Sequence, residues 1–315
     1  MGAFVARRLV TLLPLLLLIS FGVFSLVLAV PGDPARTIAG GLDADEERVE
    51  EVREDLGFDD PFFVQYGRWA VDAATGDLGE SLFSGRTVTD ELADRFPVTL
   101  SVTLGAMFFA ILFGVPLGIL AGTRPGSLAD RVITVGASFG VAVPDFFLGT
   151  ALVVLFAVQR DWLPAIGYTD LSESPLEWAQ HLLMPWIALG VSTSATLARQ
   201  VRGSMIEVLD QDYVRTARAK GLTERRVLTK HALKNALTPA LTIIGLQFAY
   251  LLGGTFIIEE IFSLPGLGSY MLEAITSRDL PVIQGVVLVV AVIFVFTNLV
   301  VDLLYGLLNP KVRVE

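Results

Sequence analysis

Long stretches without a charged side chain constrain this chain more than any other feature of its sequence. Five of them are free of charge, and a sixth is interrupted only by Asp145. In order, they occupy residues 9–30, 98–121, 132–158, 182–198, 240–258 and 282–301. Each can cross a hydrocarbon core, which takes about 17 to 25 helical residues. Because a mean hydropathy of +0.63 over 315 residues is too high for a soluble domain, we predict an all-α, polytopic protein with six transmembrane helices.

Six crossings place both termini on one side of the membrane, and the basic residues indicate which side. Fifteen Lys and Arg fall on the side of the termini and eight on the other, six of these in the long segment 31–97 that the rule discounts. We therefore predict a multi-pass protein of the plasma or inner membrane with cytoplasmic N and C termini. A cleaved signal peptide at residues 9–30 is the alternative, although 22 apolar residues are more than such a peptide usually has.

The orientation divides the chain into three parts. These are an N-terminal transmembrane helix (1–31), an acidic extracytoplasmic loop (32–97) and a five-helix core (98–315) that contains the cytoplasmic loop 199–239. Residues 31–97 carry 17 Asp and Glu against six Arg, so this loop is solvated. Its apolar positions predict one or two short helices lying on the membrane surface. They are Leu56, Phe58, Phe62, Phe63, Val64, Tyr66 and Trp69.

The overall charge balance suggests a salt-rich environment. The net charge is −10, and only four of the 23 basic residues are Lys. Dense carboxylates keep a protein hydrated at high salt, although an ordinary acidic bias explains the same numbers.

The residues that most enzyme mechanisms need are missing from the sequence. There is no Cys, there are only two His, and no Gly-Lys dipeptide is present for a phosphate-binding loop. The stretch from Gly136 to Gly140 has the spacing of a hydrolase nucleophile around Ser138, but it lies within a predicted span, where the same glycines favour close helix packing. We predict no catalytic residue, no metal site and no cofactor bound by this chain.

Several polar residues lie at membrane depth and are candidates for a translocation pathway. Asp145 follows Pro144 in the third run, where it could equally satisfy the amides of a restarting helix or line a pathway. Gln247, Tyr250 and Gly254 share one face of the fifth span, which could line the same pathway or form a helix contact. Asp302 lies one turn after Asn298, and a structural pair explains it better than a functional site.

The basic segment 199–239 between two spans predicts a helix, a tight corner and a second helix. Gly221 can adopt the left-handed conformation that ends a helix, and Thr223 can cap the next helix with Glu224 in its first turn. Arg226 and Lys230 lie on one face with Lys234. A row of charges is often only a solvated surface, but its position between two spans favours docking to another protein.

The sequence also contains the landmarks of a known family. Residues 215–221 occupy the frame of a Glu-Ala-Ala-x-x-x-Gly loop. Other landmarks are residues 7–9 and 30–34, Gln65-Tyr66, residues 76–82 and 96–100, Gly253-Gly254, Glu259, Phe262-Ser263, residues 265–268 and 278–281, Asn298, Asp302, Tyr305 and Asn309-Pro310. Together they resemble the permeases of ABC importers for dipeptides, oligopeptides and nickel, in particular the B-type subunit. The match covers nearly the whole chain.

This resemblance implies a type I ABC importer permease that forms the pathway with a second homologous permease. It also implies two cytoplasmic ABC ATPase subunits, which bind ATP and Mg, and an extracytoplasmic solute-binding protein. The other partner is the lipid bilayer, and no nucleic acid is expected. The resemblance places coupling to the ATPases at Arg215, Thr216, Ala217, Lys220, Gly221, Leu222 and Thr223.

Departures from the family pattern leave some questions open. Arg215 stands in place of the loop's Glu, Thr216 in place of Ala, and Lys234 where many permeases have Pro. The changes are typical of the peptide branch, and they leave open which side chains contact the ATPase. The alternative function is an ion-coupled secondary transporter using Asp145 and Asp302, which predicts inverted repeats that the sequence does not contain. The substrate remains open among peptides, nickel and sugars.

Overall fold

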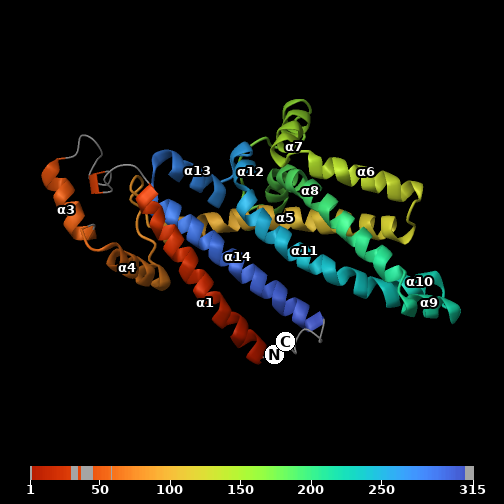
Figure 1. Ribbon diagram of the computed structural model, residues 1–315. Coiled ribbons are helices and arrows are strands. Elements are labelled where there is room, and N and C mark those ends of the chain that lie inside the picture. The colour runs from red at the N-terminus through yellow and green to blue at the C-terminus, as the bar shows by residue number, and fades with distance from the viewer. Residues whose placement is uncertain (1, 30–34, 37–44, 58, 309–315) are drawn as a thin grey trace. The chain divides into compact units, whose positions relative to one another are not determined.

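The computed structural model describes residues 2–29, 35–36, 45–57 and 59–308 (Figure 1). Within these residues every named element is helical, and extended backbone pairs only in an isolated bridge between Glu80 and Thr87. The predicted all-α class is therefore confirmed. The chain forms two compact units, one of residues 97–269 and the chain from residue 294 onward, the other of residues 2–96 and 270–293.

Five continuous helices in the described chain are long and apolar enough to cross a membrane. They include α1 (Gly2–Phe24), α5 (Val88–Thr123), α8 (Pro175–Leu209), α11 (Leu233–Gly254) and α14 (Leu280–Leu308). The sixth predicted crossing is a pair of helices, α6 (Leu128–Ala142) and α7 (Asp145–Leu152), which continues through η3 (Val153–Val158) and is bent by 93°. The run at residues 132–158 is therefore not one straight helix, because Pro144 lacks the amide that would continue α6.

In the unit of residues 2–96 and 270–293, α4 (Phe62–Thr75) packs an aromatic face against the end of α1, which η1 (Ser25–Ala29) follows. The ring centroids of Phe24 and Phe62 are 5.2 Å apart, and those of Phe21 and Tyr66 are 5.3 Å apart. Such edge-on and tilted pairs are favourable beyond the area that they bury. The predicted short helix is present, and its rings contact α1; Phe63 stacks on Phe21 and remains 74% exposed.

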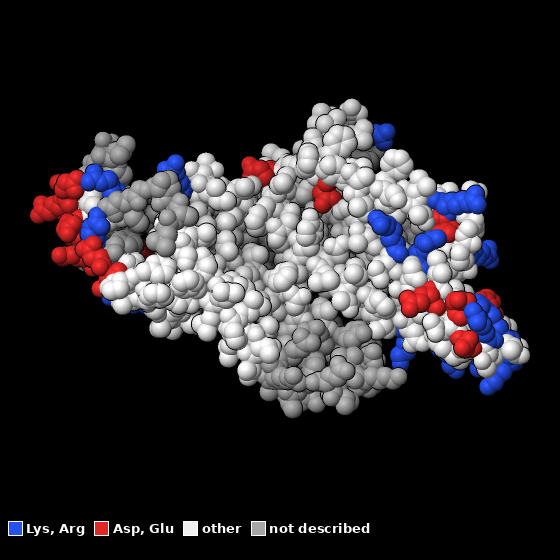
Figure 2. Space-filling view, in the orientation of Figure 1, with Lys and Arg blue, Asp and Glu red and all other residues white. Residues whose placement is uncertain are grey.

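The acidic part of this unit is α3 (Glu46–Leu56), which begins at Asp45 and ends at Gly57 in a left-handed conformation. The side chain of Asp45 accepts a hydrogen bond from the amide of Glu47, as an N-cap residue does. Figure 2 shows the acidic side chains of this region gathered on the surface. They are solvated, as predicted; the predicted helix position Phe58 lies outside the described residues.

Helix α5 begins nine residues before the end predicted for the outer loop, so the boundary at residue 97 falls inside a helix. The early turns are polar, and their charges are paired: Glu91 forms ion pairs with Arg86 and, at 2.8 Å, with Arg95. The hydroxyl of Thr87 accepts a hydrogen bond from the amide of Asp90, which stabilises the start of the helix. A search for uncharged runs cannot detect such a helix, because it extends beyond the apolar segment.

The other unit is built around α8, which packs against α6, α7 and α11. Pro185 lies inside α8, and the helix extends well beyond the 17-residue run 182–198 at both ends. The core of this unit includes Val102 and Ala106 of α5 together with Leu182 and Leu189 of α8. The short helix α12 (Phe256–Ile261) also belongs to this unit. So does the first turn of α13 (Leu267–Ser277), whose remaining residues belong to the other unit.

Three glycines of α5, spaced by four residues, let this helix approach α8 at backbone distance. A Cβ atom at Gly114 would lie 2.6 Å from the Ser194 carbonyl oxygen, and one at Gly118 would lie 2.7 Å from the Ala198 carbonyl oxygen. At Gly122 it would lie 2.5 Å from Cβ of Met205. This row of small residues therefore forms a close helix contact, as such a spacing allows.

The glycine pair in α6 follows the prediction only in part. A Cβ atom at Gly140 would lie 3.0 Å from Cβ of Ala195, so this glycine packs on α8. Gly136 has no neighbour within 4 Å at that position and faces open space.

We predict that Gly118→Ala destabilises the protein by about 1 to 3 kcal/mol, because the added methyl group collides with the backbone of α8. The control is Gly136→Ala, which meets no atom and gains up to about 1 kcal/mol of helix propensity. Thermal unfolding of the two purified variants in detergent measures the difference. Equal unfolding midpoints would show that the glycine row does not hold α5 against α8.

Candidate functional site

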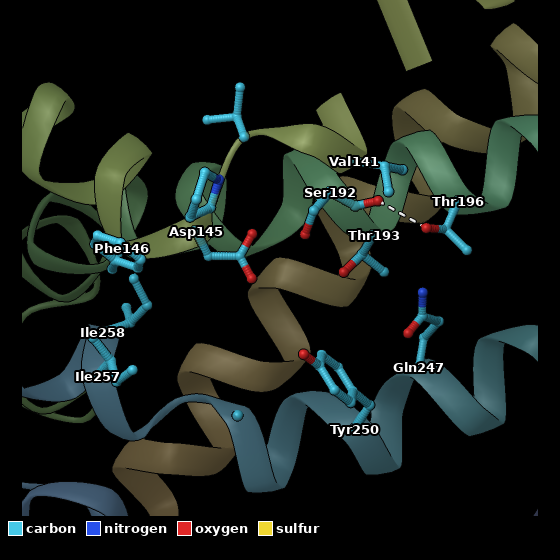
Figure 3. Close-up of a pocket in the computed structure, with 13 residues that line it drawn as sticks. Val141, Asp145, Phe146, Ser192, Thr193, Thr196, Gln247, Tyr250, Ile257 and Ile258 are labelled. Carbon is cyan, nitrogen blue, oxygen red and sulfur yellow. Dashed lines mark hydrogen bonds between the residues drawn. The ribbon is translucent and has the colours of Figure 1, made fainter. Parts of the chain in front are cut away.

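A polar cavity of about 490 Å³ lies among α7, α8 and the junction of α11 with α12, within one unit of the fold (Figure 3). It brings together all four pathway candidates from the sequence, namely Asp145, Gln247, Tyr250 and Gly254. The remaining lining residues are Val141, Val143, Pro144, Phe146, Ser192, Thr193, Thr196, Ile257 and Ile258. Two segments about a hundred residues apart in sequence thus supply opposite walls of one cavity.

The break between α6 and α7 places Asp145 in the cavity. Pro144 precedes the first turn of α7, which restarts at Asp145 as predicted. Among the described residues, no backbone amide donates to the Asp145 carboxylate, so the predicted capping role is not what the structure shows. The carboxylate instead interacts with Ser192 of α8 and points into the cavity (Figure 3).

The opposite wall comes from one face of α11. Gln247, Tyr250 and Gly254 are separated by three and four residues, so their side chains line up along the helix. Figure 3 shows Gln247 extending toward α8 and the Tyr250 hydroxyl directed into the space below Asp145. Tyr250 is 66% exposed, so the cavity is open along this wall.

The sequence analysis missed the third wall, which consists of the hydroxyl groups of α8. Thr193 donates to the carbonyl of Leu189 at 3.0 Å, and Thr196 donates to the carbonyl of Ser192 at 3.1 Å. Since each hydroxyl has one proton, these bonds leave the oxygen lone pairs as acceptors. The signal was present in the sequence as three hydroxyl residues spaced to share a face of an otherwise apolar run.

The basic segment folds as a helix, a corner and a helix, as predicted. Helix α9 (Asp212–Ala219) ends at Lys220, and Gly221 has φ +78°. The amide of Gly221 donates to the carbonyl of Arg218 at 2.9 Å, which closes the turn. The chain then enters α10 (Glu224–Arg226) and the π-helical turn η4 (Val227–Ala232), which leads into α11.

The cap of the second helix differs from the prediction. Thr223 occupies the cap position, but its side chain makes no capping hydrogen bond. Glu224 instead pairs across the corner with Arg218, with oxygen to nitrogen distances of 2.7 and 3.1 Å. The corner is therefore closed by a two-pronged ion pair and not by a hydroxyl cap.

Not all of the predicted coupling residues face outward. Ala217 is only 6% exposed and packs with Val214 and Val227, while Leu222 lies against the same small core. Sequence reasoning placed Ala217 on the docking surface, whereas the amphipathic turn of α9 directs it toward η4. The outward positions are Arg215, Thr216, Lys220, Gly221 and Thr223. Figure 2 shows the charges of both signs that surround them.

An ion pair with a buried carboxylate joins the first turn of α6 to α8. Asp130 is 3% exposed and accepts hydrogen bonds from Arg202, at 2.9 Å to one of its nitrogens, and from the Gly126 amide at 2.8 Å. Sequence analysis could not find this pair, because the partners are 72 residues apart.

A buried carboxylate, Glu259, fixes the start of α13. It accepts hydrogen bonds from the hydroxyls of Thr99 and Thr255, at 2.7 and 3.0 Å, and from the amides of Gly268 and Ser269, at 2.7 and 3.2 Å. Burial raises the pKa of Glu259, because removal from water disfavours the charged form, and the four donors act against this shift. The carboxylate thus serves as a non-local N-cap for α13.

Two further features considered in the sequence analysis are the Asn298 and Asp302 pair and a metal site. The side chain of Asp302 lies outside the described residues, and Asn298 donates to the carbonyl of Phe294 at 3.0 Å. Among the described residues, no group of three or more His, Cys, Asp or Glu could hold a metal ion.

We predict that Glu259→Leu destabilises the start of α13 by about 3 kcal/mol or more, because it leaves the buried amide of Gly268 and the partly buried amide of Ser269 without an acceptor. Glu259→Gln keeps an acceptor oxygen and should lose only about 1 kcal/mol. The neighbouring Glu260 is exposed, so Glu260→Leu is the matched control. Thermal unfolding and limited proteolysis near residues 262–269 measure the effect; similar losses in Glu259→Leu and Glu260→Leu would contradict this capping role.

A bundle of apolar spans, with a polar cavity between them and a basic helical corner beyond them, has the architecture of a solute permease. The chain belongs to the family of binding-protein-dependent transport system inner membrane components, whose model matches residues 114–314. The model of the N-terminal part of such membrane components matches residues 1–103. The chain is therefore a multi-span inner-membrane permease of an ABC importer, a class that works with ATPase partners.

Relatives with full-length similarity support this assignment. The chain is 41% identical over 313 residues to the probable peptide ABC transporter permease protein y4tP of Sinorhizobium fredii, covering 99% of this chain and 100% of the relative. It is 42% identical over 310 residues to the glutathione transport system permease protein GsiC of Escherichia coli, covering 98% of each. The matched lengths include both the cavity and the corner.

Solved structures show the same fold. An inward-facing form of the MetNI methionine ABC transporter matches with a TM-score of 0.58 at 19% identity, covering 69% of this chain and 96% of that chain. A second crystal form of MetNI matches with a TM-score of 0.56 at 21% identity. The predicted type I ABC importer permease architecture is thus confirmed.

Proposed function

We propose that this chain forms one half of the translocation pathway of a peptide importer. It pairs with a second homologous permease, two cytoplasmic ATPases bind at the corner of residues 199–239, and an extracytoplasmic solute-binding protein delivers the solute. The observation that carries this proposal is the cavity in which Asp145, Gln247 and Tyr250 meet between spans. The names of the full-length relatives, which refer to peptides and to glutathione, support a peptide as the solute.

In this proposal the ATPase subunits supply the ATP-binding chemistry, and this chain supplies the mechanical link. ATP and Mg bind to those partners, since the sequence of this chain has no phosphate-binding loop. The corner is suited to transmit force because Val214, Ala217 and Val227 hold α9 and η4 together as one body. Its exposed residues, among them Arg215 and Lys220, would contact the ATPase.

The proposed orientation places the termini and the corner in the cytoplasm and residues 32–97 outside. Because the chain has no Cys, single cysteines at Ser84 and Thr229 report on the two sides, and both positions are exposed. We predict that an impermeant thiol reagent labels Ser84→Cys on intact cells and labels Thr229→Cys only after the membrane is opened. The reverse pattern would invert the orientation.

The coupling role is tested at Gly221. A Cβ atom there meets nothing within 4 Å, so a substitution acts only through the backbone conformation at φ +78°. A β-branched residue pays about 1 to 2 kcal/mol or more in this region, whereas Asn adopts it readily. We predict that Gly221→Val inserts in the membrane but loses most of the copurifying ATPase and of the transport, and that Gly221→Asn keeps both.

A second control separates the corner's shape from its surface charges. Glu224→Ala removes an exposed ion pair worth about 0 to 1 kcal/mol and should retain nearly all ATPase binding. Wild-type ATPase retention and transport in Gly221→Val would show that this corner is not the coupling element.

A further inference from the structure

The charge and the hydrogen-bond acceptors of the cavity around Asp145 point to one class of ligand. We propose that it binds the ammonium group of its solute, as found at the free amino terminus of a peptide, with Asp145 as the counter-charge. This inference rests on the proposed function, since it assigns chemistry to the cavity on the proposed pathway.

The charge in the cavity comes from a single residue. Asp145 is the one ionisable acid or base of the Asp, Glu, Lys and Arg types among the 13 lining residues. Within the described chain, no Lys or Arg lies within ion-pair distance of its carboxylate. A carboxylate at membrane depth without a basic partner is costly, and a bound cation would compensate that cost. The acids that the protein buries, in contrast, have partners: Asp130 pairs with Arg202, for example, and Glu259 accepts from four hydrogen-bond donors.

The hydrogen-bonding groups around Asp145 have the same preference. The Thr193 and Thr196 hydroxyls have already donated to carbonyls of α8, so they offer lone pairs to the cavity. Gln247 adds an amide oxygen and Tyr250 a hydroxyl oxygen from the opposite wall (Figure 3). An ammonium group has three donors and no acceptor, and such a wall of acceptors can satisfy them. An anionic solute would be repelled by the carboxylate, and the N–H and O–H groups of Gln247 and Tyr250 are neutral donors that bring no opposite charge.

The apolar part of the lining leaves room for the rest of the solute. Phe146 and Ile257, which are 50% and 57% exposed, line the cavity together with the buried Ile258. They provide unspecific contacts for side chains of different kinds. A volume of about 490 Å³ is in the range of small-molecule sites, about 300 to 1,000 Å³, and suits a short peptide. Charge therefore selects the amino terminus, while the apolar surface accepts varied side chains.

The absence of Cys from the sequence gives a direct test of the cavity's charge. In the importer assembled with its partner subunits, Gln247→Cys is modified either by a methanethiosulfonate carrying a trimethylammonium group or by one carrying a sulfonate. We expect the ratio of the cationic to the anionic rate, normalised to a free thiol, to be about tenfold, because the Asp145 carboxylate across the cavity attracts one reagent and repels the other. Asp145→Asn should bring this ratio close to one.

Thr229→Cys, on the exposed surface of η4, is the control, and Asp145→Asn should leave its ratio unchanged. Tyr250→Cys serves as a second reporter if Gln247→Cys does not assemble, since Tyr250 lies on the same wall. Mass spectrometry of this chain identifies the modified residue, so cysteines of the partner subunits do not interfere.

Protection by defined peptides tests the ligand class itself. We expect millimolar Ala-Ala-Ala to slow modification of Gln247→Cys several-fold, and N-acetyl-Ala-Ala-Ala to have little effect. Asp145→Asn should abolish the difference between the two peptides. Equal protection by both peptides, or a rate ratio that does not depend on Asp145, overturns the ammonium proposal and leaves the importer function standing. If neither reporter reacts with either reagent in an importer that transports, the cavity is not on the pathway, and both the pathway assignment and the ammonium site fail.

Discussion

The close contact between α5 and α8 is the constraint on which the rest of the unit that contains α8 depends. Water is absent from the bilayer core, so spans associate through close packing and not through the hydrophobic effect. The glycines at 114, 118 and 122 bring α5 to backbone distance from α8, which fixes the position and rotation of α8. Once α8 is fixed, Thr193 and Thr196 must face the cavity and Arg202 must reach Asp130. One packing interaction thus sets both the lining of the cavity and the tie at the end of α6.

The bend at Pro144 shows how a functional group is kept in an apolar environment. A straight helix through residues 132–158 would place Asp145 on a lipid-facing or packed surface at a high energetic cost. The 93° bend instead starts a new helix at Asp145 and turns its carboxylate toward Ser192 and the cavity. Irregular backbone at membrane depth is tolerated where it lines a cavity, and this break does so. The bend therefore explains how an acidic residue is accommodated here: it directs the Asp145 carboxylate into the cavity.

The sequence predicted the features that depend on local composition and missed those that depend on distant contacts. Apolar runs located the spans, and the left-handed Gly221 was found because glycine adopts that conformation without a steric cost. The start of α5 was misplaced, since its first turns are charged and become stable through the ion pairs of Glu91. The burial of Ala217 was not predicted, because its partner Val227 follows the corner. No sequence pattern linked Asp130 to Arg202 or Glu259 to Thr99, because the partners are far apart in the chain. Both pairs form only after the helices have packed.

The same long helix connects the cavity with the corner, and this gives the proposed mechanism a physical route. Thr193 and Thr196 of α8 line the cavity; further along, Val201 and Met205 pack against Ala232 and Ala236, and Leu209 reaches the core of the corner. These contacts are made by buried side chains on continuous helix, so a displacement of the corner cannot be absorbed by a flexible linker. The π-helical turn η4 lies where the corner joins α11, the helix that carries Gln247 and Tyr250 to the opposite wall. Movement of the corner would therefore act on two walls of the cavity together, through α8 on one side and through α11 on the other.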